Sequence, residues 1–313
     1  MPPVVSAWLT WQRVAQLATA LFSVSVGALL VHSHDSQQKL KSSEEARLLA
    51  DARQTAGLLT DFLAEQRHFV RSLADSNEID VFLTNRALGM SMRYGLGANL
   101  YEVDSSLRRA IERRQALGSP VYSRIRYVDE SGEVLADTSP GGLDLPPMKT
   151  AGLDPVLDID AVHHRIIASA AVGYRGTPGG TVTTVTDLAL LSRYLSSPID
   201  DEGPRQLLID ANGRPLTASL SMALTAEPLP ALTRLPEGNP VPAAQLPAGL
   251  PLPVQAGDLV LRSAVGDTGL SLVTLVPESR LHGPLAVRIF PYVAVAGPLL
   301  LLLALLATHG TRQ

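Results

Sequence analysis

The middle of the chain changes from helical to strand-like hydrophobic spacing. Residues 33–82 contain no proline, and their apolar positions, among them Leu48, Leu59 and Leu73, recur at helical intervals, which predicts a long amphipathic helix. At about 1.5 Å per residue, a helix over residues 33–73 would extend roughly 60 Å, so we interpret it as a stalk. We interpret its polar face as solvated surface. We expect its apolar stripe to pack partly on its own domain and partly on another chain.

A β-hairpin is predicted at residues 122–138, where a period of two replaces the helical period. A turn-forming segment, Asp129-Glu-Ser-Gly132, separates two short runs in which apolar and polar residues alternate. The apolar positions of these runs are Ile125, Tyr127, Val134 and Ala136. Alternation on both sides of a turn segment is typical of a hairpin with one buried face.

The same hairpin unit recurs downstream. Asp129-x-x-Gly132-x-x-Leu135 returns as Asp210-x-x-Gly213-x-x-Leu216, again behind an apolar strand. The Ala-Val-Gly of residues 171–173 likewise returns at residues 264–266. One supersecondary unit is therefore used twice. The second copy carries a proline-rich insertion, residues 227–253, which we expect to lack regular structure.

The remaining elements follow from glycine and proline positions and from β-branched runs. Glycines interrupt the helical pattern in residues 85–99, and a second helix is predicted over residues 100–117, ended by Gly118 and Pro120. We expect a loop over residues 140–155. The further expected elements are strands at 165–173 and 180–186 joined by a hairpin at 174–179, a short helix at 187–195, and a strand at 270–276 of the second copy.

Two uncharged apolar runs, residues 14–31 and 289–308, raise the hydrophobic content to 46% of the chain. About 20 apolar residues span a bilayer core as a helix, so both runs are predicted membrane helices. Two alternatives remain. The first run could be a cleaved signal peptide with a small-residue site at Val26-Gly27-Ala28, and the second could be a buried core helix.

The charges support one orientation of the membrane helices. All 30 acidic residues lie between the two apolar runs, whereas the flanks hold only Arg13, Arg288 and Arg312. The positive-inside rule then puts the short ends in the cytoplasm and the acidic middle outside. The chain has no cysteine, so no disulfide stabilises the outer region. This region is large enough to fold without disulfides.

This arrangement resembles the double Cache sensor domains of bacterial histidine kinases, diguanylate cyclases and chemoreceptors. The resemblance covers residues 37–282, most clearly 90–138 and 168–195. It implies an α+β fold in which two transmembrane helices flank a long stalk helix and two tandem PAS-like Cache modules with antiparallel sheets. It also implies a ligand site in the distal module. The Arg-x-Trp element of the amino-acid-sensing branch is missing, because the chain's tryptophans are Trp8 and Trp11.

The expected organisation has five parts, each with its own role. The parts are a cytoplasmic N-terminus and first transmembrane helix (residues 1–32), a stalk helix (33–84), a membrane-distal Cache module (85–195), a membrane-proximal Cache-like module with the insertion 227–253 (196–286), and a second transmembrane helix with a short cytoplasmic tail (287–313). The region 33–286 would then lie in the periplasm of a bacterial cell, anchored in the inner membrane.

Enzymatic motifs are missing from the sequence. It has no Gly-x-x-x-x-Gly-Lys, no Gly-x-Ser-x-Gly and no His-Glu-x-x-His, and Gly95-Leu-Gly97 lacks the third glycine of a dinucleotide loop. The two histidine clusters, residues 32–34 and 163–164, lack the further ligands that a metal site usually has. We expect no catalysis, no cofactor, no metal and no nucleic-acid partner.

Polar residues on or beside the predicted distal sheet are the candidates for ligand binding. They are Arg93, Tyr94, Arg124, Arg126, Tyr127, Asp137, Tyr174 and Asp187. In a regular strand Arg124 and Arg126 share one face, where they could hold a carboxylate. For each arginine the alternative is an ion pair with Glu130, Glu133 or Asp137. Tyr127 and Tyr174 fit the role of core aromatics better than that of residues that stack on a ligand.

The sequence thus predicts a membrane-anchored sensor. It would bind a small molecule, with a carboxylate as one candidate, pair as a homodimer through the stalk, and signal to a cytoplasmic output domain or protein. The chain ends shortly after the second apolar run, so we expect either the input half of a longer receptor or a separate sensor subunit. The alternative is a ligand-free envelope scaffold that contacts a partner through the stalk and the proline-rich insertion.

Overall fold

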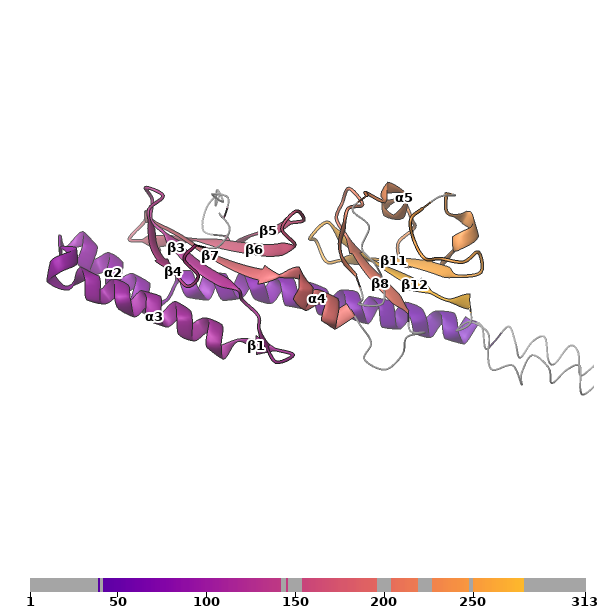
Figure 1. Ribbon diagram of the computed structural model, residues 1–313, viewed down its shortest axis with the longest axis horizontal. Helices are drawn as coiled ribbons and strands as arrows, with labels where there is room; N and C mark the ends of the chain where they lie inside the picture. Colours follow the sequence, from indigo (N-terminus) through magenta and orange to yellow (C-terminus); the bar gives the residue numbers. More distant parts are fainter. Residues whose placement is uncertain are drawn as a thin grey trace, which may run out of the picture. The chain divides into compact units, whose positions relative to one another are not determined.

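The computed structural model describes residues 39, 42–141, 145, 154–195, 204–218, 227–247 and 250–278 (Figure 1). Both predicted membrane helices, residues 14–31 and 289–308, lie outside these ranges. Within the ranges, no helix combines the length and the apolar character that crossing a membrane requires. The chain divides into two compact units, Met1–Ala50 with Pro277–Gln313, and Asp51–Val276. Residues 42–50 of the first unit are helical, and the second unit holds both sheets.

A long helix opens the second unit, as the hydrophobic spacing predicts. It occupies residues 51–74 of that unit, and its apolar stripe is buried. The helical pattern is not continuous to Phe82, because Ser76 adopts an extended conformation and a new helix, α2 (Asn77–Ala87), begins after it. Short polar residues such as Asp75 and Ser76 favour helix ends, since their side chains compete for backbone hydrogen bonds. A kinked turn, η1 (Met92–Leu96), then leads into α3 (Gly97–Arg113).

The distal module is a five-stranded antiparallel sheet in the order β4-β3-β7-β6-β5. Its strands are β3 (Arg124–Val128), β4 (Val134–Asp137), β5 (Val156–Asp160), β6 (Arg165–Tyr174) and β7 (Thr177–Asp187). A two-residue ribbon of β1 (Gln115–Ala116) and β2 (Ser119–Pro120) precedes it, and α4 (Leu188–Leu195) follows it. The predicted hairpins and the short helix are confirmed. Strand β5 follows the expected loop and is an element that the sequence pattern did not suggest.

The proximal module repeats the antiparallel design in the order β10-β11-β12-β8-β9. Its strands are β8 (Arg205–Ile209), β9 (Pro215–Ala218), β10 (Val241–Pro242), β11 (Leu259–Val265) and β12 (Leu270–Val276). Two short helices, α5 (Pro230–Thr233) and η2 (Ala243–Gln245), lie between β9 and β11. The predicted strands of the second copy are thereby confirmed.

The two Asp-x-x-Gly turns have the same hydrogen bonds, which confirms the internal repeat. Asp129 Oδ1 accepts the N–H of Glu133 at 2.9 Å, and Asp210 Oδ1 accepts the N–H four residues on at 2.8 Å. The N–H of Gly132 donates to the carbonyl oxygen of Asp129 at 3.1 Å, and the N–H of Gly213 donates to that of Asp210 at 3.0 Å. Both glycines have positive φ, 89° and 78°, a conformation that favours glycine.

The expectation that the proline-rich insertion lacks regular structure is wrong for its described residues. Its leucines recur between the prolines, and Leu229 and Leu232 are buried in the core under the proximal sheet. Leu229 also donates its N–H to the carbonyl oxygen of Gly213 at 2.7 Å. A Cβ on Gly213 would lie 2.7 Å from the Leu229 backbone, so the insertion packs directly on the repeated turn.

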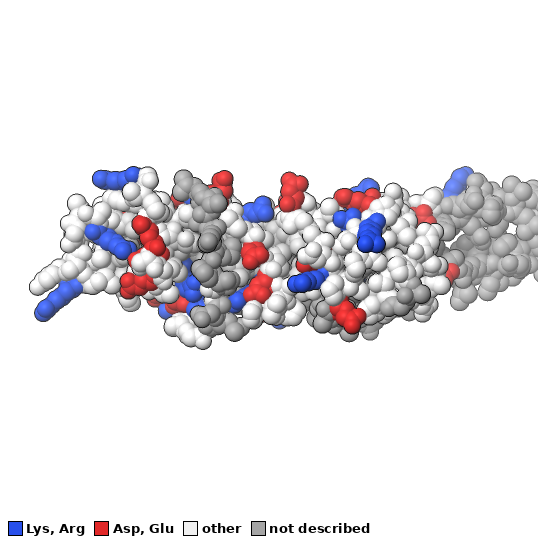
Figure 2. Space-filling model, turned by 90° about the horizontal axis from the view of Figure 1, so that it is seen from above, with Lys and Arg blue, Asp and Glu red and all other residues white. Residues whose placement is uncertain are grey.

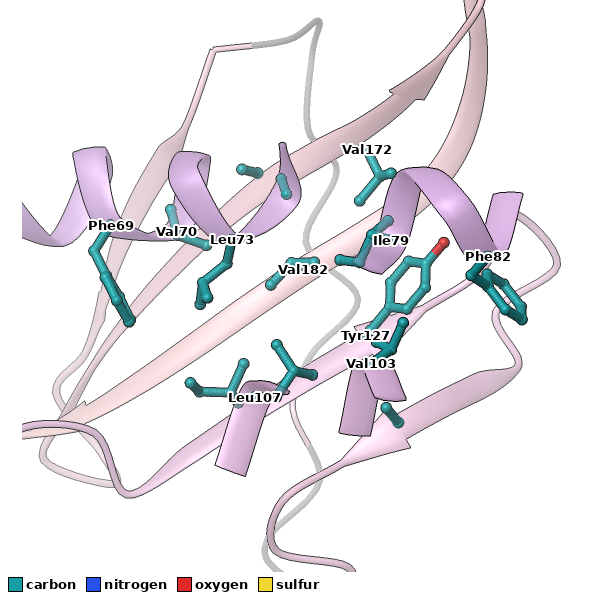
Figure 3. Close-up of a cluster of buried hydrophobic side chains, with 14 of the residues drawn as sticks. Phe69, Val70, Leu73, Ile79, Phe82, Val103, Leu107, Tyr127, Val172 and Val182 are labelled. Atoms are coloured by element: carbon teal, nitrogen blue, oxygen red, sulfur yellow. The ribbon is translucent and has the colours of Figure 1, made fainter. Parts of the chain in front are cut away.

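The long helix is buried against both sheets. Toward the distal module, Phe69, Val70 and Leu73 meet the helix-facing side of the sheet in one apolar cluster (Figure 3). Phe69 stacks on Tyr122 with ring centroids 4.4 Å apart, and Phe82 meets Tyr127 edge to face at 6.3 Å. Nearer its start the helix joins α4 and the proximal sheet in a second cluster. One face of the distal sheet is therefore closed by helices, and the other carries the polar residues.

Candidate ligand-binding site

Strand β3 separates apolar and polar side chains onto the two faces of the distal sheet. Ile125 and Tyr127 are fully buried against the helices, whereas Arg124 and Arg126 lie on the opposite face and are partly exposed. This alternation is the one expected of a regular strand. The structure therefore brings the two arginines to one face, as the sequence predicts.

A row of polar side chains crosses the sheet on that face. Arg126 is paired in register with Asp137 of β4 and Thr183 of β7, and Thr183 is paired with Ser169 of β6. Cross-strand partners share a face of the sheet. The hydroxyl groups of Ser169 and Thr183 are buried and lie 2.9 Å apart. We call these four residues the polar row.

Arg124 forms a nearly buried ion pair with Asp137, which belongs to the polar row. Arg124 Nε lies 2.9 Å and 3.2 Å from the two carboxylate oxygens, Nη2 contacts Oδ2, and the two side chains are only 11% and 10% exposed. Burial alone would raise the pKa of Asp137, but the hydrogen bonds from Arg124 and from the Ser139 N–H hold it below its ordinary value. Arg124 thus already has a carboxylate partner, which is the alternative that the sequence left open.

Leu145 lies over the same face. Leu145 is buried in a small apolar cluster with Ile167 and Val185, whose side chains flank the polar row. Arg126 Nη2 donates to the carbonyl oxygen of Leu145 at 3.5 Å. Apolar side chains beside a few placed polar groups are the usual lining of a small-molecule site.

The other candidate residues lie apart from the polar row. Arg93 and Tyr94 belong to η1 at the far end of the helices, where Tyr94 is 75% exposed and Arg93 lies 6.0 Å from its ring centre. Tyr127 points into the helical core, where burial raises the pKa of its phenol and its hydroxyl donates to Gly179 at 2.8 Å. Tyr174 packs at the edge of the same core.

Asp187, the remaining candidate, is exposed at the start of α4. Its carboxylate accepts the N–H of Ala189 at 2.8 Å, which is the capping use that a short acidic residue often has at a helix start. Arg124, Arg126 and Asp137 are therefore the candidates that the structure brings together.

A pocket of about 770 Å³ lies at the turn end of the distal sheet, and the sequence did not suggest it. Two turns line it, the β3–β4 turn with Asp129 and Glu130 and the β6–β7 turn with Arg175 and Thr177. Thr181, which precedes the polar row on β7, lines it as well. These residues are distant in sequence, so the signal exists only after the strands have paired.

Asp129 gives the pocket a rigid wall. Its carboxylate accepts hydrogen bonds from Ser131 and Glu133 and lies 3.1 Å from Arg86 Nη2. Burial by itself would raise the pKa of Asp129, but these hydrogen bonds lower it below its ordinary value. The carboxylate is consequently ionised and fixed, so it shapes the pocket rather than offering a free ligand group.

Over the face drawn in Figure 2, acidic and basic side chains are interspersed without a large field of either sign. Nucleic-acid-binding surfaces usually gather their Lys and Arg on one face. This view therefore gives no support to a nucleic-acid interface.

The fold is shared with solved ligand-binding domains. The domain of the Campylobacter jejuni chemoreceptor Tlp3, in complex with 4-methylisoleucine, is similar with a TM-score of 0.53 and 15% identity, covering 78% of this chain and 95% of that one. The domain of the Pseudomonas fluorescens chemoreceptor CtaA, in complexes with L-alanine and L-serine, is similar with TM-scores of 0.50 and 16% identity. These likenesses cover 75% and 76% of this chain, and 98% and 99% of those chains. No protein-family model and no curated protein sequence matches the chain.

Proposed function

We propose that this chain, which has the double Cache sensor fold, is an extracytoplasmic sensor that binds a small ligand in its distal module. The observation that carries the proposal is the division of the distal sheet into two faces. One face is closed by helices, and the other bears the polar row, is covered at Leu145 and ends in the 770 Å³ pocket. A purely structural sheet has no need for buried hydroxyls and a buried ion pair on its second face.

The ligand would lie on the polar row, beside Leu145. Arg126 is the better-placed cation for an anionic group, because Arg124 is held bidentately by Asp137. The similar domains were solved in complex with amino acids and an amino-acid analogue. This chain lacks the Arg-x-Trp element, so its ligand would be a small carboxylate or another polar molecule that fits the row.

Signalling requires that the ligand prefer one of two conformations, since equal affinity for both shifts no population. In the proposed mechanism, closure around the ligand moves the long helix, which follows the first predicted membrane helix in the sequence. A homodimer through that helix would supply the second element against which it moves. A cytoplasmic domain or protein would read the motion, with the region 33–286 in the periplasm.

The direct test is a thermal-shift screen of the full chain against carboxylates, amines, amino acids and nucleobases. A hit should be weakened by Arg126→Ala about tenfold or more, the loss expected for a charge-assisted hydrogen bond. Arg47→Ala, on the exposed surface of residues 42–50, serves as the control and should leave binding unchanged. An equal loss in both variants would refute the site. No hit, together with a defined protein partner, would instead support the scaffold.

A further inference from the structure

We infer that the pocket at the turn end of the distal sheet takes a short, extended, zwitterionic peptide rather than a single amino acid. This inference rests on the proposed ligand-binding role of the distal module and names the ligand class for its pocket. Three independent features of the pocket carry it: its size, the two charges at its rim, and the strand edge along its wall.

The size of the pocket exceeds what one small amino acid needs. Its volume is about 770 Å³, in the upper part of the range of about 300–1,000 Å³ that is typical for drug-sized ligands. Alanine or serine would leave most of this space to water, whereas a peptide of a few residues would fill it. Volume alone therefore favours a longer ligand.

The charges on the pocket wall fall into two groups. Arg71 is held by Asp75 at 2.7 Å and 2.6 Å, and Asp129 is held by Arg86. Glu130 and Arg175, in contrast, are exposed, and neither forms an ion pair within the described part of the chain.

Glu130 and Arg175 stand on different turns that both line the pocket. Arg175 is steadied by the Tyr174 ring, whose centroid lies 5.4 Å from its guanidinium carbon. A ligand with an ammonium group at one end and a carboxylate at the other matches this pair. Because the two charges lie on separate turns, a peptide, whose charged ends are separated by its backbone, can reach both.

The pocket wall includes a stretch of strand β6 whose outer edge pairs with no other strand among the described residues. Pairing with β5 ends at Val156 opposite Ser169, while β6 continues to Tyr174. Arg71 Nη1 donates to the carbonyl oxygen of Ala171 at 3.3 Å, so this carbonyl is directed away from β7. Alternate residues of a strand direct their peptide groups to the same side, so Gly173 is expected to face that side as well.

A peptide is the ligand that uses such an edge. Ala171, Val172 and Gly173 all line the pocket, and the exposed Gly173 has no side chain to shield its backbone. An extended peptide can add main-chain hydrogen bonds to an open strand, which is a common mode of peptide recognition. A single amino acid has no internal peptide bond with which to pair.

The experiment is isothermal titration calorimetry of the full chain with tri-alanine. We expect tri-alanine to bind about tenfold or more tightly than L-alanine. Acetylating its amino terminus should weaken binding to the wild type but not to Glu130→Gln. Amidating its carboxyl terminus should weaken binding to the wild type but not to Arg175→Gln. Methylating its central peptide nitrogen should also weaken binding, because one main-chain donor is lost.

Matched controls come from the same surface. Glu133→Gln changes a carboxylate of the same turn that does not line the pocket, and Arg109→Gln changes an exposed arginine of α3. Both should keep the wild-type affinity. The inference is overturned if the blocked peptides bind as well as tri-alanine, or if the control variants lose as much affinity as Glu130→Gln and Arg175→Gln.

The failure of this inference is distinct from the failure of the proposed function. If L-alanine or a simple carboxylate binds as tightly as tri-alanine, the peptide class is wrong and the sensor proposal stands. If neither tri-alanine nor any compound of the screen binds, both are wrong.

Discussion

The ion pair between Arg124 and Asp137 permits a quantitative prediction. The Asp137 side chain is only about one-tenth exposed in the wild type, and in Arg124→Ala it would lose the guanidinium and keep the Ser139 N–H, at 3.0 Å, as its described partner. Removing one member of a buried pair typically costs about 3–5 kcal/mol. Nearby Arg126 also favours the charged form of Asp137, so we expect a loss at or just below the bottom of this range, about 2–3 kcal/mol of unfolding free energy.

Urea denaturation of the full chain measures this loss. Asp137→Asn should destabilise the protein in the same way, and the double variant Arg124→Met/Asp137→Leu should recover much of the loss because no buried charge is left unpaired. Glu65→Ala is the control, because its ion pair with Arg114 is exposed and should contribute little. A loss in Arg124→Ala no larger than in Glu65→Ala would refute the reasoning.

The pH dependence gives a second check on the same pair. Asp137 has a folded-state pKa below its ordinary value of 3.8, so the ion pair stabilises the protein fully above that value. Its contribution is lost as pH falls through the lower, folded-state pKa. The stability difference between the wild type and Asp137→Asn should therefore be flat near neutral pH and shrink in acid. A difference that stays constant in acid would contradict this account.

Three further predictions follow from packing and charge. Gly180→Ala should cost about 2 kcal/mol or more in the same urea denaturation, because a Cβ there would lie 2.2 Å from a backbone oxygen of the neighbouring strand. Gly89→Ala, also at positive φ, has open space and should cost less. Leu232→Ala should lower the unfolding free energy by about 2–4 kcal/mol, because Leu232 is buried, whereas Leu88→Ala should change it little, because Leu88 is 73% exposed. Equal losses in the two variants would refute the claim that the insertion packs on the proximal sheet. The pKa of Asp160 is lowered to about 2. Asp160→Asn should therefore destabilise the protein above pH 3.8 and progressively less as pH falls toward 2. A loss of stability that stays undiminished at about pH 2 would contradict this prediction.

The elements that sequence reasoning located are those specified by local chemistry. The turns at Asp129 and Asp210 need a short acidic side chain and a glycine three residues later, and these residues stand close together in the sequence. The strand alternation of Ile125 and Tyr127 is likewise local. Because the two hairpins depend on few distant contacts, their repeat can be recognised from the order of residues alone.

The elements that sequence reasoning missed depend on distant contacts. The proline-rich insertion is ordered by the burial of Leu229 and Leu232 against strands of the proximal sheet, which no local pattern reveals. The pocket arises where turns more than forty residues apart approach each other. Arg93 and Tyr94 precede the strands in the sequence, and the whole of α3 lies between them and β3. Their positions could be learned only from the packing.

The same strands form both faces of the distal sheet, and this links the candidate site to the long helix. Strands β6 and β7 supply Ser169 and Thr183 to the polar row. On the other side, Thr186 of β7 bonds Gln66 of the helix at 3.3 Å, and Ala171 of β6 accepts a hydrogen bond from Arg71. Close-packed interiors transmit displacement rather than absorb it. A ligand that shifts these strands must therefore move the helix or break its bonds to them, and only a ligand with different affinities for the two arrangements can do so.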